Sequence, residues 1–110
     1  MSDEHQRREY FRIDYPKLNN ARIVILSREF PVIDISQHGI KLLNDSGFDL
    51  REGSELKGGV QLLCGVSVVV SARVLRCQPD NTVVLYLEEG IPLKLMYDEH
   101  RFLIKNLPTS

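Results

Sequence analysis

Short runs of β-branched and aliphatic residues, separated by turn-forming residues, recur along residues 21–89. In the longest run, small apolar residues occupy every second position from Val66 to Val74, and mostly polar residues lie between them. Alternation with a period of two is typical of a strand with one buried face. The pattern predicts strands over six ranges: residues 21–26, 30–36, 40–43, 54–63, 66–78 and 82–88.

Turn-forming residues set the connections between these strands. We expect Ser27-Arg28-Glu29 to turn the chain between the first two strands, and Gly58-Gly59 to weaken or bulge the fourth. Pro79-Asp80-Asn81 predicts the turn before the last strand. Six short strands with regular turns predict an all-β fold, a six-stranded antiparallel β-barrel.

The hydrophobic spacing changes after Gly90. Pro92 suits the first turn of a helix. Five residues then follow the three-or-four spacing of one helical face: Leu93, Met96, His100, Leu103 and Leu107. We therefore predict one amphipathic C-terminal α-helix over residues 92–106 that closes the barrel, with His100 on its packed face. Four acidic residues are interpreted as solvated surface charge: Asp49, Glu52, Asp98 and Glu99.

Length and charge limit the possible functions. Residues 1–110 have the usual size of one domain, and we divide them into a flexible arginine-rich arm (1–15), a barrel (21–89) and the helix. The net charge of -1 gives no global attraction to DNA or an anionic membrane, so an anion site must be local. Cys64 and Cys77 lack metal-ligand spacing, and no signal peptide or long apolar run is evident. We expect a reduced cytoplasmic protein without cofactor or metal, a monomer or weak dimer.

Two polar motifs stand out against this background. Arg7, Arg8 and Arg12 lie close together near the N-terminus, where their spacing fits one face of either a helix or a strand. A solvated basic tail is the simplest alternative. In residues 30–36, alternation places Ile33 and Ile35 on one face and Val32, Asp34 and Ser36 on the other.

Gly39 follows Asp34 and Ser36 at a sharp change of direction. We expect it to adopt a positive φ, which other residues rarely do. The alternative is a purely structural turn in which Asp34 and Ser36 bond their own backbone.

Together, Arg7-Arg8-x-x-x-Arg12 and Asp34-x-Ser36-x-x-Gly39 resemble the signature of the PilZ domain, a bacterial receptor module for cyclic di-GMP. The resemblance covers nearly the whole chain and implies a PilZ-like barrel, cytoplasmic location, no catalysis and a second-messenger effector. It implies that Arg8 and Arg12 grip guanine and phosphate, while Asp34, Ser36 and Gly39 form the opposing wall.

The ligand chemistry agrees with these assignments. A guanidinium can bind a phosphate, or the O6/N7 edge of guanine, through two parallel hydrogen bonds. The other guanine edge donates hydrogen bonds that a carboxylate such as Asp34 can accept. Arg7 matches the additional arginine of members that bind a stacked ligand dimer, so we predict two ligands per chain. The downstream protein partner, in motility, biofilm or virulence, is not specified by the sequence.

Other function classes stay open at this stage. One is a PilZ-like protein-interaction adaptor that binds no nucleotide, although the intact motifs argue against it. Another is an OB-like barrel for single-stranded nucleic acid, which usually requires a broad basic groove. An enzyme is the least favoured, because no carboxylate pair or nucleophile with a base stands out in the sequence.

Overall fold

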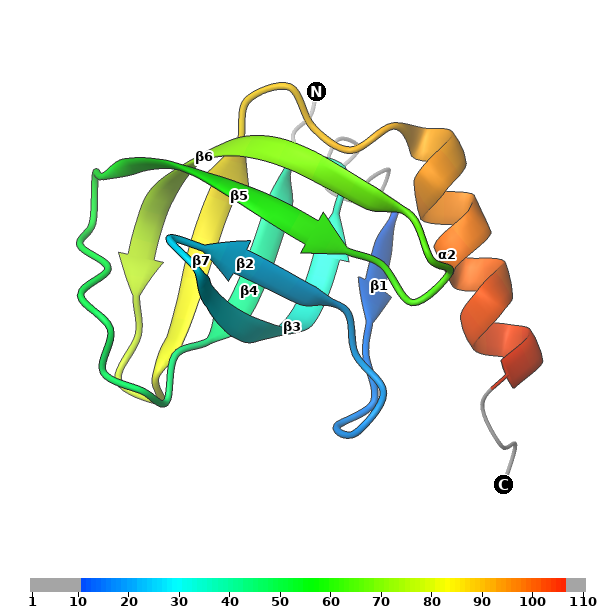
Figure 1. The fold of residues 1–110 in the computed structure, drawn as a ribbon, viewed down its shortest axis with the longest axis horizontal. Helices are drawn as coiled ribbons and strands as arrows, with labels where there is room; N and C mark the ends of the chain where they lie inside the picture. The colour runs from blue at the N-terminus through cyan, green and yellow to red at the C-terminus, as the bar shows by residue number, and fades with distance from the viewer. Residues whose placement is uncertain (1–10, 107–110) are drawn as a thin grey trace, which may run out of the picture.

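Antiparallel pairing joins the strands of residues 11–106, the part of the chain that the computed structural model describes. The strands are β1 (Arg12–Asp14), β2 (Arg22–Ile25), β3 (Arg28–Ser36), β4 (Gly39–Leu43), β5 (Glu55–Gln61), β6 (Ser67–Cys77) and β7 (Thr82–Leu87). Strands β2 to β7 form a six-stranded barrel in the order β3-β2-β5-β6-β7-β4, which closes through pairing of β3 with β4 (Figure 1). The predicted barrel is confirmed, with β1 as one extra strand on β3.

The extra strand corrects the prediction of a flexible arm over residues 1–15. Within that range, Arg12–Asp14 pair with β3, and Ile13 is buried opposite Ile35. Phe11 and Tyr15 also pack against the core. Apolar residues at positions 11, 13 and 15 show the period-two pattern of a strand, so the sequence contained the signal.

The structure contradicts the predicted position of the first turn and the bulge considered in the fourth strand. The first hairpin turns at Leu26 and Ser27, both with positive φ, and Arg28 and Glu29 already belong to β3. Strand β5 pairs without a register shift through Gly58 and Gly59. A Cβ on Gly58 would lie 3.1 Å from the carbonyl oxygen of Val24, so glycine there permits close strand packing.

A bulge in β3 breaks the simple alternation that the sequence predicted. Val32 pairs with Leu42 and Asp34 with Lys41, so Ile33 is an additional residue relative to β4. Val32 is therefore buried together with Ile35, and Ile33 is only half-buried. Asp34 and Ser36 still lie on the outer face, as predicted.

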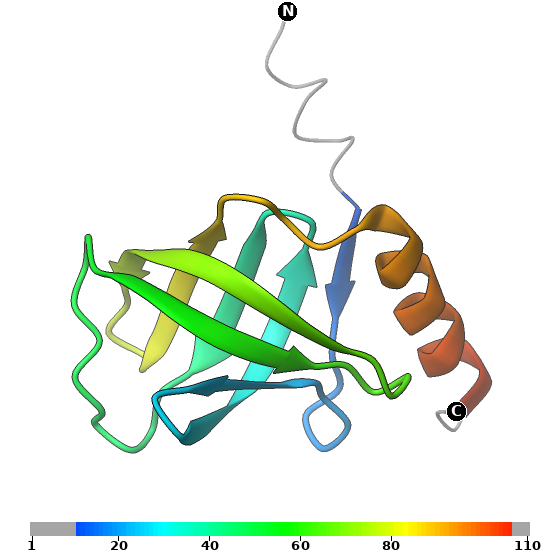
Figure 2. The same cartoon turned by 45° about the horizontal axis from the view of Figure 1, so that its top comes forward.

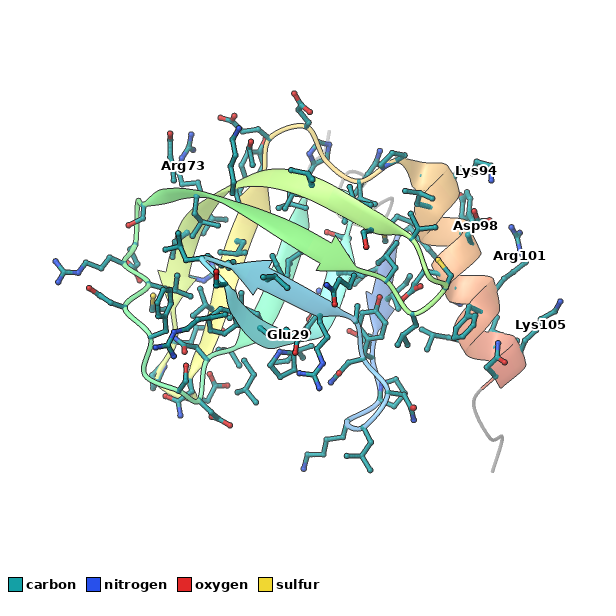
Figure 3. The ribbon with its side chains drawn as sticks, viewed as in Figure 1. Glu29, Arg73, Lys94, Asp98, Arg101 and Lys105 are labelled. Carbon is teal, nitrogen blue, oxygen red and sulfur yellow. The ribbon has the colours of Figure 1, made fainter. Side chains whose placement is uncertain are left out.

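The C-terminal helix, α2 (Leu93–Asn106), lies beside β1 in both views (Figures 1 and 2). Its buried residues are Met96, Glu99 and Leu103. His100 is exposed, contrary to the prediction, because the helix is rotated so that the stripe through Glu99 faces the barrel. The opposite side carries charges: Figure 3 shows Lys94, Asp98, Arg101 and Lys105 pointing away from the barrel.

The barrel interior is filled by aliphatic side chains from every barrel strand. Among them, Ile23, Val32, Leu42, Val60 and Leu85 are completely buried. Within residues 11–106, no helix is both long and apolar enough to cross a membrane.

Candidate functional site

Strand β1 brings the arm and the polar turn together. Arg12 pairs with Ser36, and Asp14 pairs with Asp34. Directly opposed residues of an antiparallel pair lie on the same face of the sheet. Because Ile13 and its partner Ile35 are buried, the four polar side chains lie on the outer face. A cation from the first motif is therefore adjacent to the Asp-x-Ser turn.

The pKa of Asp34 reflects both its partial burial and the charges around it. Partial burial raises the pKa of Asp34, and the nearby carboxylate of Asp14 adds to the rise, while Arg12 and Lys41 oppose it. The guanidinium Nε of Arg12 lies 3.7 Å from a carboxylate oxygen of Asp14, and both side chains are mostly exposed. Such an exposed pair is weak. Arg12 can therefore exchange Asp14 for an anionic ligand at little cost.

Gly39 leaves space beside Ser36 and has no positive φ. It is the first residue of β4, and its φ lies outside the left-handed region, which corrects the sequence-based expectation. A Cβ at this position would lie 3.1 Å from the Oγ of Ser36. The Ser36 hydroxyl donates only a long bond of 3.5 Å to the carbonyl oxygen of Gly39, so it is available to a ligand.

Four of the six predicted site residues are thus brought together: Arg12, Asp34, Ser36 and Gly39. Arg7 and Arg8 lie outside the described residues. Lys41 was not predicted as part of the site. It is the cross-strand partner of Asp34 on β4 and adds a second cation beside that carboxylate.

An aromatic pocket of about 430 Å³ adjoins the turn. Ser36 and Gly39 line it, together with four rings that sequence analysis did not assign to the site: Phe11, His38, Tyr86 and Tyr97. Phe11 directly precedes Arg12 of the arginine motif, so its position in the sequence could have indicated that it lies near the site. Tyr86 and Tyr97 depend on the β4–β7 register and on the position of α2, which spacing in the sequence does not reveal.

Comparison with models of known families identifies the domain. The family model of the PilZ domain matches residues 6–97, which include β1, the whole barrel and the start of α2. The chain belongs to the PilZ domain family. PilZ domains form a family of non-catalytic receptors for cyclic di-GMP.

Structural comparison supports the same fold for this PilZ domain. The crystal structure of an uncharacterized Legionella protein is similar, with a TM-score of 0.63 and 21% sequence identity. The match covers 88% of this chain and 100% of the Legionella chain. No curated protein matches the chain.

A buried carboxylate fastens α2 to this PilZ barrel. Glu99, predicted to be solvated, is 0% exposed. The Tyr15 hydroxyl donates to its Oε2 at 2.7 Å, and the backbone N–H groups of Leu63 and Cys64 donate to its two oxygens at 2.9 Å. Burial, and then the bond to Glu99, strongly raise the pKa of Tyr15. Glu99 thus connects the residue after β1 to the β5–β6 turn.

Proposed function

We propose that this PilZ domain is a cytoplasmic second-messenger effector that binds cyclic di-GMP between β1 and the Ser36–Gly39 turn. The observation that carries this proposal is the pairing of Arg12 with Ser36. Through this pairing, Arg12 of the arginine motif lies on the same outer face as the Asp34 carboxylate and the Ser36 hydroxyl of the second motif. No catalytic step is part of the proposed role.

Each residue has a chemical role toward this ligand. The Arg12 guanidinium can donate two parallel hydrogen bonds to a phosphate or to the O6/N7 edge of guanine. Asp34 would accept hydrogen bonds from the N–H groups on the opposite guanine edge, and Ser36 would donate its hydroxyl, whose bond to the Gly39 carbonyl is long. Gly39 leaves room beside that hydroxyl.

Arg7 and Arg8 would add cations from the segment that precedes β1. Arg8 would bind the guanine or phosphate next to the group held by Arg12, and Arg7 would serve a second, stacked ligand. We therefore expect calorimetry to give two cyclic di-GMP molecules per chain. A stoichiometry of one would eliminate the two-ligand assignment and leave the site itself intact.

The direct test is titration of the purified protein with cyclic di-GMP, GTP and a short RNA at the same salt concentration. We expect saturable binding to cyclic di-GMP alone. The Arg12→Ala variant should weaken it by about 5- to 150-fold, because one bidentate guanine contact contributes about 1–3 kcal/mol. Arg51→Ala is the matched control, since Arg51 is an exposed arginine paired with Asp49 in the β4–β5 loop. Equal binding by Arg12→Ala and the parent would refute the site.

The proposed output is a change in the surface offered to a protein partner. Two phosphates would draw Arg7, Arg8 and Arg12 together on the outer face, where these like charges otherwise repel one another. We expect cyclic di-GMP to slow hydrogen exchange in residues 1–15, chiefly before Arg12, because Arg12–Asp14 already pair with β3. Unchanged exchange in that segment at saturating ligand would contradict this mode of signalling.

A further inference from the structure

The aromatic pocket extends the site beyond the two family motifs. Tyr86 of β7 is the cross-strand partner of Gly39, lines the pocket and is 37% exposed. The Tyr86 ring is stacked with that of His38, with 6.1 Å between their centroids and 18° between their planes. A flat aromatic surface therefore borders the Ser36 hydroxyl.

A second aromatic surface comes from α2 and the start of β1. Phe11 packs against Tyr97 with 5.2 Å between ring centroids, and it forms a T-shaped contact with His100 with 5.3 Å between centroids. Tyr97 is 47% exposed, so its ring is accessible to a ligand. The pocket thus has rings on its strand side and on its helix side, a lining that suits a planar heteroaromatic ring.

The polar groups of the turn are held in place around these rings. His38 Nδ1 lies 2.8 Å from the carbonyl oxygen of Leu87, which can only accept, so Nδ1 carries a proton and, in the neutral ring, Nε2 is an acceptor. The backbone N–H of Leu87 donates to the His38 carbonyl at 3.0 Å, and that of Ile91 donates to the Gln37 carbonyl at 2.8 Å.

Gly90 allows this close approach between the turn and the β7–α2 connection. Its φ is +79°, and a Cβ there would lie 2.8 Å from Cε1 of His38. The pocket wall is therefore preformed, so that ligand binding would cost little conformational entropy of the protein.

We propose that this pocket binds one purine base of the ligand, with Tyr86 as the stacking residue and with Ser36 Oγ and His38 Nε2 as hydrogen-bonding groups at its edge. The inference rests on the proposed function, because the base belongs to cyclic di-GMP. Tyr86 thereby becomes a binding residue that neither family motif contains. The helix side of the pocket, through Tyr97, makes α2 part of the ligand site.

Two variants of Tyr86 test the stacking. Tyr86→Leu keeps an apolar side chain on the strand but removes the ring, and it should raise the Kd for cyclic di-GMP by about 5- to 150-fold, equivalent to about 1–3 kcal/mol of base stacking. Tyr86→Phe keeps the ring and should bind within about two-fold of the parent, because stacking does not need the hydroxyl. Thermal melting of both variants checks that they are folded.

A fluorescence experiment gives an independent readout. The chain has no tryptophan, so Tyr86→Trp introduces a single reporter. Cyclic di-GMP should quench it on stacking. Val69→Trp is the control, because Val69 is 81% exposed on β6 and does not line the pocket. Its emission should not change.

The outcomes separate this inference from the function on which it rests. If Arg12→Ala loses binding while Tyr86→Leu binds like the parent and Tyr86→Trp is not quenched, the base pocket is refuted and the receptor function stands. If the parent protein does not bind cyclic di-GMP at all, both proposals fail.

Discussion

Replacing Glu99 with glutamine tests whether the buried carboxylate fastens α2 to the barrel. Three donors converge on its two oxygens: the Tyr15 hydroxyl and the N–H groups of Leu63 and Cys64. Glutamine has nearly the same shape but offers one acceptor oxygen and one NH₂ donor. Whichever way the amide is oriented, at least one backbone N–H then faces another donor.

The magnitude follows from these contacts. A hydrogen bond to a charged group contributes about 1.5–3 kcal/mol, and a buried donor without an acceptor costs about 1–3 kcal/mol. We expect Glu99→Gln to lower the free energy of unfolding by about 2–4 kcal/mol, a large part of the roughly 5–15 kcal/mol typical of a domain. In a domain of about 100 residues this lowers Tm by at least about 8 °C.

Thermal and urea unfolding followed by circular dichroism measure the effect. Asp98→Asn is the matched control, because the neighbouring Asp98 lies on the outward side of α2 and pairs with Lys94 and Arg101 (Figure 3). Its Tm should change little. Tyr15→Phe removes one of the three donors, so its effect and that of Glu99→Gln should be less than additive. A Glu99→Gln variant with the same Tm as the parent protein would refute this role of the carboxylate.

Three further predictions concern the site and the first hairpin. Burial raises the pKa of Asp34, so the folded state holds this proton more tightly than the unfolded state, and the charged form opposes folding above the ordinary pKa of about 4. Asp34→Asn should therefore raise Tm at pH 7, with a gain that vanishes below about pH 4; a lower Tm at pH 7 would contradict this. Asp14→Asn should tighten cyclic di-GMP binding by up to about five-fold in calorimetry, because it frees Arg12 from a competing carboxylate; weaker binding would count against it. Leu26 and Ser27 form a two-residue turn with φ of 51° and 67°, so replacing them with Asn-Gly should add about 1 kcal/mol to the free energy of unfolding in urea, and an unchanged midpoint would argue against strain there.

The strands were predictable because their signal is local. Alternation from Val66 to Val74 requires only one solvated and one buried face, and β6 occupies the expected region. Glu99 was not predictable in this way. Its burial depends on N–H groups of Leu63 and Cys64, which lie 36 and 35 residues earlier in the chain. Helical spacing puts position 99 on the same stripe as Met96 and Leu103, but its residue type assigns it to solvent, because most glutamates are exposed.

In the candidate site, too, features set by local spacing were predictable and features set by strand register were not. Spacing within one strand was enough to place Asp34 and Ser36 on the outer face. The location of Arg12 beside Ser36 required the register of β1 on β3, and the Tyr86 wall required the register of β7 on β4. Gly39 was singled out for its backbone freedom, but in the structure it has no positive φ, and its small size leaves space beside Ser36.

The bulge at Ile33 divides β3 into two segments, and the alternation of buried and outward-facing residues shifts by one position between them. Phe30 and Val32 face the core in the segment that pairs with β2, and Ile35 faces it in the segment that carries the site. A one-residue change in length absorbed at the bulge would leave Asp34 with the same partner on β4. The first hairpin can therefore diverge in length among related chains without moving Asp34 and Ser36, and an alignment gap at Ile33 is compatible with an unchanged outer face around them.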